Sequence, residues 1–117
     1  MAFEDEVRAV MERCSGARGV AIVDGDGIPV VAADQDGRLE ELAAEYSTVV
    51  REIQRAAREL DHGDVSQLTV EAEFLTIVLT SIAAGYFFVV LLGRDGLAGK
   101  ARFLSRLASA RLHSEFI

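Results

Sequence analysis

The segment FLTIVLTSIAAGYFFVVLL, residues 74–92, decides the fold, because it can form either one membrane-spanning helix or two strands. It contains no charged residue, and it is as long as a transmembrane helix needs to be. β-Branched and aromatic residues nevertheless dominate both halves, and Ala-Ala-Gly at 83–85 offers a turn between them. Thr76, Thr80 and Ser81 are also unfavourable on a lone lipid-facing helix. We therefore predict two strands and no insertion into a membrane.

A second hairpin is predicted from GVAIVDGDGIPVVAA, residues 19–33. Two runs suited to strands, 20–23 and 28–33, enclose Asp-Gly-Asp-Gly, which is a strong signal for a tight turn. Pro29 in the second run cannot donate a backbone hydrogen bond. This strand should therefore lie at an edge of the sheet.

Three helices are also predicted. Apolar residues at spacings of three and four predict helices over residues 3–14, 39–60 and 97–112. In the longest helix the apolar positions form one stripe, and Gly63 follows as its natural stop. With one further strand, the order α-β-β-α-β-β-β-α makes residues 1–117 a single α/β (α+β) domain.

The predicted strands differ in how completely they must be covered. Residues 86–92 are apolar at every position, so helices should cover both faces of this central strand. Residues 65–72 alternate loosely between polar and apolar side chains, as in a half-buried strand. This strand and the proline-containing strand should form the two edges of the sheet, and one of these edges is free to recruit a partner.

Composition excludes several classes of protein. The 117-residue chain has a formal net charge of −7, whereas a nucleic-acid interface requires a basic face. The basic residues after Gly93 instead suit the end of a helix. Cys14 is the single cysteine, so we predict a packed thiol in a reducing cytoplasm. The N-terminal segment lacks the basic start and apolar stretch of a signal peptide, which also favours a cytoplasmic location.

Two loops imitate ligand-binding motifs but lack the residues that these motifs require. A calcium loop of the EF-hand type beginning at Asp24 would need a carboxylate-type ligand where Ile28 stands and a bidentate glutamate where Gln35 stands. The segment GRDGLAGKA, residues 93–101, is one residue too long for a phosphate-binding loop and has no Ser or Thr after its lysine. We instead expect Asp95 to help cap the last helix.

The sequence contains no pattern of catalytic residues. His62 and His113 are expected to be exposed, and no His or Cys cluster has the spacing of a metal site. Glu40, Glu41 and Glu45 are expected on the outer side of the long helix, as a solvated or partner-facing surface. We therefore expect no intrinsic enzymatic activity, no cofactor and no metal.

The whole chain resembles the roadblock (dynein light-chain) domain family, in particular the bacterial members that act with Ras-like GTPases. The resemblance rests on the order of the elements and on the segments GVAIVDGDGIPVVAA, LEELAAEYSTVVREIQRAARELDHG, DVSQLTVEAEFLTIVLTSIAAGYFFVVLLG and LAGKARFLSRLASA. It implies a five-stranded antiparallel sheet with helices on both faces, and a homodimer that joins edge strands and pairs the long helices. It also implies a role as a platform for, or regulator of, a Ras-like small GTPase.

The residues themselves also favour a dimer. The long helix has a second face that contains Arg51, Arg55 and several small residues, and the small residues would let another helix approach closely; a solvated face is the alternative. Strand 65–72 carries no proline or lysine to protect its edge. The predicted dimer interface comprises Ala44, Ser47, Thr48, Arg51, Val65, Gln67, Thr69 and Glu71. The predicted GTPase-facing residues are Glu41, Glu45, Arg51, Glu52 and Arg55.

Three functions follow from these predictions. A regulator would bind one nucleotide state of the GTPase more tightly and shift its switch loops, and Arg51 or Arg55 is best placed if an arginine enters the nucleotide site. A passive scaffold or adaptor would bind a partner without altering any rate. A small-molecule sensor rests on fold analogy alone, and the filled core argues against it.

Overall fold

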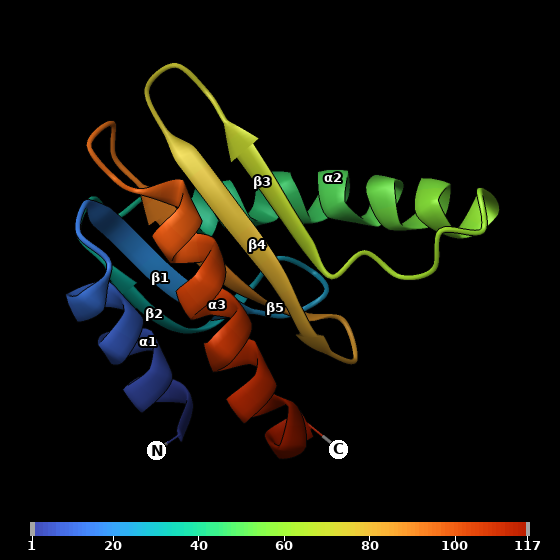
Figure 1. Ribbon diagram of the computed structural model, residues 1–117, viewed down its shortest axis with the longest axis horizontal. Helices are drawn as coiled ribbons and strands as arrows, with labels where there is room; N and C mark the ends of the chain where they lie inside the picture. The colour runs from blue at the N-terminus through green and yellow to red at the C-terminus, as the bar shows by residue number, and fades with distance from the viewer. Residues whose placement is uncertain (1, 117) are drawn as a thin grey trace.

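The computed structural model describes residues 2–116, which fold into helices on both sides of one sheet (Figure 1). In chain order the elements are α1 (Ala2–Arg13), β1 (Ala17–Val23), β2 (Pro29–Asp34), α2 (Leu39–Glu59), β3 (Gln67–Glu71), β4 (Thr76–Ala83), β5 (Tyr86–Leu92), α3 (Ala98–Leu112) and the short 3-10 helix η1 (His113–Phe116). The predicted order of helices and strands is confirmed, and η1 is the one addition within the described residues.

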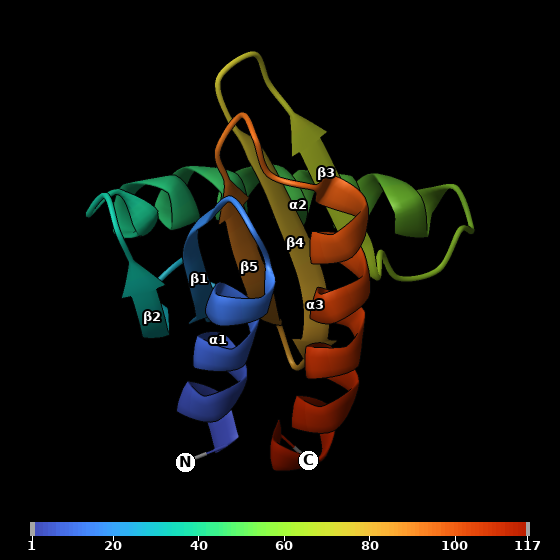
Figure 2. The same cartoon turned by 60° about the vertical axis from the view of Figure 1, so that its left-hand side comes forward.

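The strands form a single antiparallel sheet in the order β2-β1-β5-β4-β3. β5 is central, as its uninterrupted apolar sequence predicts, and β2 and β3 are the edges. Helices α1 and α3 lie side by side on one face, while α2 crosses the other (Figure 2). The predicted covering of both faces is therefore confirmed.

The side chains of the central strands alternate between two core layers. The layer under α1 and α3 contains Val20, Ile22, Phe88 and Val90, together with Val10 of α1 and Ala108 of α3. The layer under α2 contains Ala21, Val23, Val89 and Leu91, together with Leu39, Ala43 and Val50 of α2. All these residues are buried, so β1 and β5 are the shared wall of both layers.

Residues 74–92 form the predicted hairpin. Strands β4 and β5 pair from Thr76 opposite Leu92 to Ala83 opposite Tyr86, and Ala84 and Gly85 make the turn with positive φ. Within residues 2–116, no helix combines the length and the apolar composition that spanning a bilayer requires. The segment is thus two strands of the sheet and not one long helix.

The carboxylate of Asp24 organises the predicted turn between β1 and β2. Its Oδ1 accepts hydrogen bonds from the backbone N–H groups of Asp26, at 2.9 Å, and Ile28, at 3.0 Å. The backbone N–H of Gly27 also donates to the carbonyl oxygen of Asp24 at 3.0 Å. An Asp that closes its own turn in this way explains the Asp-Gly repeat without a ligand.

The predicted cap of α3 is wrong. Leu97 occupies the N-cap position and no side chain caps this helix, because Asp95 lies inside a turn that the Gly96 N–H closes on the Gly93 carbonyl at 3.1 Å. A different carboxylate serves α2. Oxygen Oδ2 of Asp34, at the end of β2, accepts a hydrogen bond from the first N–H of α2, that of Leu39, at 3.0 Å.

The predicted start of β3 at residue 65 is also wrong. Gln54 of α2 holds both backbone groups of Val65, because its Oε1 accepts the Val65 N–H at 2.9 Å and its Nε2 donates to the Val65 carbonyl at 3.3 Å. These bonds tie the segment after α2 to the helix. Pairing with β4 therefore begins only at Gln67.

Replacing Gly27 by alanine should destabilise the fold strongly. Gly27 has φ of +84°, and a Cβ atom there would lie 2.8 Å from the Ala43 carbonyl oxygen in α2. We expect Gly27→Ala to lower the free energy of unfolding by about 3 kcal/mol in urea titrations. Gly37→Ala is the control, because Gly37 has φ of +71° but nothing within 4 Å of the new Cβ, and it should lose only about 1 kcal/mol. Equal losses would show that the turn does not pack against α2.

Candidate functional site

Helix α2 leaves the largest part of its surface uncovered. Figure 1 shows its C-terminal half running beyond the edge strand β3. Only Leu39, Ala43 and Val50 of this helix are buried. A helix that is amphipathic along its whole length but only partly covered has apolar surface left for a partner.

The uncovered apolar residues of α2 form one seam. Leu42, Tyr46, Val49, Ile53, Ala56 and Leu60 follow one another at spacings of four and three, which is the repeat by which two helices pack along each other. Leu42, Tyr46 and Ile53 of this seam are partly buried, whereas Val49 is 43% and Leu60 66% exposed. The stripe that the sequence suggested as one core face therefore has two parts, a buried part and this α2 seam.

The opposite flank of α2 holds the β1–β2 turn. Arg51 donates from Nη1 to the carbonyl oxygen of Gly25 at 2.6 Å, and the hydroxyl of Ser47 donates to the Ala44 carbonyl at 2.9 Å. Ser47 also packs against Gly27, where a Cβ atom would meet its Oγ. Two residues of the predicted dimer interface are thus engaged within their own chain, whereas Ala44 and its neighbour Thr48 are exposed.

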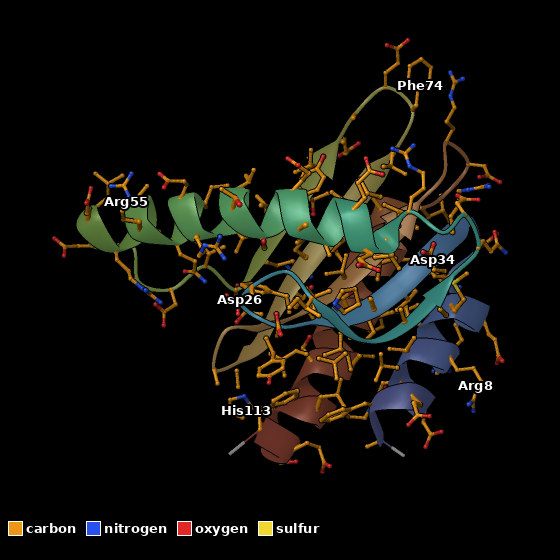
Figure 3. All side chains as sticks on the ribbon, turned by 180° about the vertical axis from the view of Figure 1, so that it is seen from behind. Arg8, Asp26, Asp34, Arg55, Phe74 and His113 are labelled. Carbon is orange, nitrogen blue, oxygen red and sulfur yellow. The ribbon has the colours of Figure 1, made fainter. Side chains whose placement is uncertain are left out.

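The outward face of α2 carries the predicted GTPase-facing glutamates. Glu41, Glu45 and Glu52 are all exposed, and their spacing of four and seven puts them on one side of the helix. Arg55 lies between two carboxylates, because its guanidinium donates to Glu52 and to Glu59 at 3.0 Å each. These hydrogen bonds raise the pKa of Arg55 above its usual value. Figure 3 shows Arg55 near the C-terminal end of α2.

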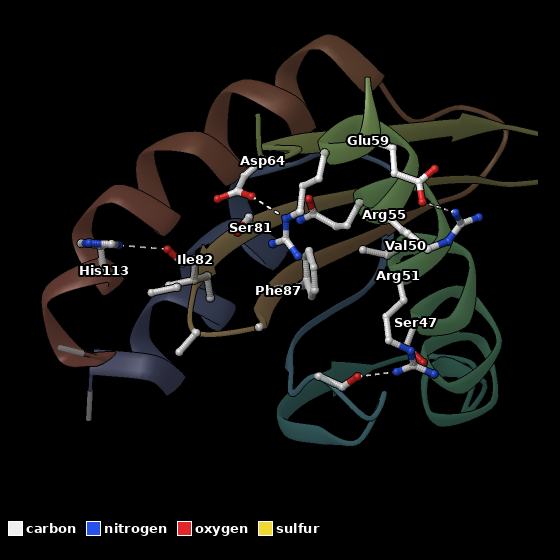
Figure 4. A pocket seen from close by; sticks show the side chains of 16 residues that line it. Ser47, Val50, Arg51, Arg55, Glu59, Asp64, Ser81, Ile82, Phe87 and His113 are labelled. Carbon is white, nitrogen blue, oxygen red and sulfur yellow. Dashed lines mark hydrogen bonds and ion pairs between the residues drawn. The ribbon is translucent and has the colours of Figure 1, made fainter. Parts of the chain in front are cut away.

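A cavity of about 820 Å³ lies between α2 and the β4–β5 turn (Figure 4). Arg51 and Arg58 line it from α2, Phe87 lines its floor, and His113 lies at its far end. Arg58 is paired with Asp64 at 2.9 Å, and Nδ1 of His113 lies 2.9 Å from the Ile82 carbonyl oxygen. Arg51, Arg58 and His113 therefore each have a partner within the chain.

Strand β3 presents the other predicted interface. It pairs with β4 on one side, and nothing within residues 2–116 covers its second edge. Gln67 points toward α3, where its Nε2 donates to Thr80 Oγ1 at 2.9 Å and to the Arg102 carbonyl at 3.0 Å. Thr69 is partly buried and Glu71 is exposed. The backbone groups of this edge are free to pair with another strand.

The structure places the predicted site residues on distinct surfaces. Glu41 and Arg55 are 14 residues apart on α2, which separates them by about 21 Å along the helix axis. The predicted strand residues lie at the edge that α2 crosses (Figures 1 and 2). Sequence reasoning missed the α2 seam, although its alternating spacings of four and three were visible, because all apolar positions of the helix were assigned to one stripe.

The single cysteine is not part of a site. Cys14 is buried beside the α1 layer of the core, and burial raises the pKa of its thiol. A thiol with a raised pKa is a weak nucleophile at neutral pH. The predicted packed thiol is confirmed. Within residues 2–116, no group of three or more His, Cys, Asp or Glu side chains is arranged to hold a metal ion.

Solved structures with the same fold cover nearly the entire chain. A roadblock/LC7 domain from Streptomyces avermitilis has 18% sequence identity and a TM-score of 0.85, with 97% of this chain and 96% of that chain covered. MglB of Myxococcus xanthus has 18% identity and a TM-score of 0.85, covering 97% and 94%. MglC of the same organism has 28% identity and a TM-score of 0.70, covering 98% and 99%.

No curated protein matches the sequence. The model of the Roadblock/LC7 domain family matches residues 4–92, from the first turn of α1 to the end of the central strand β5. This match includes the hairpins, the long helix and all five strands. The chain therefore belongs to the Roadblock/LC7 domain family.

Proposed function

We propose that the protein is a homodimeric regulator of a Ras-like small GTPase, which it binds on the face formed by two α2 helices. The observation that carries the proposal is the uncovered α2 seam on a helix that extends beyond its own sheet. The choice of a small GTPase as the partner rests on the resemblance of the sequence to family members that act with Ras-like GTPases. MglB structures from Myxococcus and Thermus are among the structural neighbours.

The geometry of one protomer supports a twofold dimer. If β3 pairs with β3 of a second copy, the two sheets become one, and the twofold axis stands perpendicular to it. Both α2 helices then lie on the same face, and each overhanging half covers the sheet of the other copy. The partly exposed residues of that sheet face, Leu68 and Val70, gain a cover, as do Val49 and Leu60 of the α2 seam.

The outward face of the paired α2 helices suits a basic partner surface. Glu41, Glu45 and Glu52 are exposed, and the twofold axis would place two such rows side by side. Binding one nucleotide state of a GTPase more tightly would shift its switch loops toward that state. The regulator needs no active site of its own, because the GTPase supplies the nucleotide and its magnesium ion.

A passive scaffold is the alternative, and one observation favours it. Arg51 is held by the Gly25 carbonyl and Arg55 by Glu52 and Glu59. An arginine that enters a nucleotide site from the dimer would first have to leave these partners. We therefore expect that any regulation acts through the conformation of the switch loops and not through an inserted arginine.

Val49→Glu should convert the dimer into monomers, because it puts a charge into the α2 seam while changing a residue that is 43% exposed in the single chain. Losing two buried valines per dimer is expected to raise the dimer Kd by about 100-fold. Sedimentation equilibrium measures this Kd. Thr48→Glu, one position along, is the matched control and should leave the dimer intact. If Thr48→Glu dissociates the dimer and Val49→Glu does not, the helix pairing uses the face first predicted from the sequence.

The GTPase partner is tested by capture from native extract with the tagged protein, in parallel with GDP and with a non-hydrolysable GTP analogue. We expect a Ras-like GTPase mainly in the sample with the analogue, identified by mass spectrometry. Capture of the same non-GTPase protein in both samples would favour the scaffold and contradict the regulator.

With the purified GTPase, Glu45→Lys combined with Glu52→Lys should weaken binding about tenfold, since it reverses two charges on the docking face.

Arg51→Ala and Arg55→Ala should each leave the stimulated rate of GTP hydrolysis within about threefold of the original, because loss of an inserted arginine would cost about a thousandfold or more. A loss of that size in either variant would establish arginine insertion.

A further inference from the structure

Helix α3 carries a cationic side chain that no carboxylate among residues 2–116 neutralises. Arg106 is exposed, and among residues 2–116 it takes part in no ion pair or side-chain hydrogen bond. The other cation of the same helix with a defined environment, Arg111, is paired with Glu6 of α1 at 2.8 Å. Lys100 and Arg102 of α3 also have no ion pair among residues 2–116, but of these three cations only Arg106 lines this cavity.

Arg106 lines a cavity of about 300 Å³ between α3 and the β3 end of the sheet. Hydroxyl groups of Ser66, Thr80, Ser81 and Ser109 contribute to the lining, together with apolar surface from Ile82 and Ala110. Ser109 is only 6% exposed, and its Oγ has no hydrogen-bond partner. A buried hydroxyl without a partner is uncommon, and together with a guanidinium it forms a donor set suited to a carboxylate.

The faces of β3 show which side chains of a second copy can reach this cavity. The Gln67 side chain bonds to Thr80 and to the Arg102 carbonyl of α3, so the odd-numbered residues of β3 face α3. Leu68 and Val70 pack in the α2 layer of the core. In a twofold antiparallel pair, residues that lie opposite each other share a face, so odd-numbered residues must pair with odd-numbered ones. The axis must then pass between the two copies of one residue, and not between two successive residues of the strand.

Only one such register pairs the entire strand. An axis through Thr69 places all five residues of β3 opposite the β3 of a second copy, whereas an axis through Leu68 or Val70 leaves strand ends unpaired. Centred on Thr69, the pairing puts Glu71 of the second copy opposite Gln67, with Cβ atoms about 5 Å apart. Gln67 already touches α3, and the cavity with Arg106 begins at the adjacent Ser66.

We propose that this cavity binds the side chain of Glu71 of a second copy. The Glu71 carboxylate pairs with Arg106 and accepts a hydrogen bond from the Ser109 hydroxyl. The site occurs twice in the dimer, once on each side of the axis. The inference rests on the proposed homodimer and adds to it the register of β3 and a charge pair that selects that register. Glu71 is exposed in the single chain, so it is free to make this contact.

Charge reversal tests the pair through mixing. Glu71→Arg gives a chain with arginine at both positions, and Arg106→Glu gives one with glutamate at both, so each homodimer contains two repulsive contacts. We expect each variant alone to show a dimer Kd raised about tenfold or more, since two exposed ion pairs are lost and replaced by like charges. Mixed in equal amounts, the two variants should form a heterodimer with both contacts attractive, with a Kd within about threefold of the original.

The matched control uses two exposed residues of α1, remote from β3. Glu12→Arg and Arg13→Glu, alone or mixed, should keep the Kd of the original dimer. Sedimentation equilibrium gives the homodimer constants and native mass spectrometry gives the heterodimer fraction. If Glu71→Arg and Arg106→Glu both keep the original Kd, or if mixing forms no excess heterodimer, the proposed ion pair between Glu71 and Arg106 is contradicted, although the proposed dimer is not. If the original chain is a monomer at micromolar concentration, the proposed dimer itself fails.

Disulfide cross-linking of single-cysteine variants tests the register of the β3–β3 pairing directly. Opposite residues of paired strands have Cα atoms about 5 Å apart, within the range for a disulfide. Under mild oxidation Thr69→Cys should cross-link two chains, whereas Leu68→Cys and Val70→Cys should not. Cys14 is buried and does not compete. Cross-linking through position 68 or 70 instead would place Glu71 opposite a different residue and overturn the assignment.

Discussion

The burial of β5 on both faces is the constraint on which the structure depends. Its residues Phe88 to Leu92 are almost completely excluded from solvent, which requires a helical layer above and another below the sheet. α1 and α3 supply one layer, and α2 supplies the other. Because β1 and β4 flank β5, the least apolar strands are left at the edges, and β3 is one of them.

Only part of α2 is used to cover the sheet, and the rest of its apolar surface remains exposed. Its buried residues lie in the half that crosses the sheet, while the α2 seam from Leu42 to Leu60 follows the helix to its end. The overhanging half and the open edge of β3 lie at the same border of the molecule (Figure 1). One symmetric contact can cover both, which is why a single physical argument links the fold to the proposed dimer.

The polar side chains around this border hold the chain together more than they prepare chemistry. Arg51 fastens the β1–β2 turn, Gln54 fastens the segment before β3, and Arg58 pairs with Asp64. Such contacts suit a surface that presents a fixed shape to a partner. Arg106 differs from them, because its charge and the adjacent Ser109 hydroxyl have no partner in the described chain.

The sequence by itself determined the order of the elements, the central place of β5, the edge position of the Pro29 strand and the burial of Cys14. These follow from periodicity, turn chemistry and the lack of a backbone donor, all of which are properties of neighbouring residues. Only the tertiary structure decided that Gln54 captures the backbone of Val65 and that the apolar stripe of α2 divides into a core and a seam. Such features depend on which distant segments meet, and local patterns do not encode where a sheet ends beneath a helix.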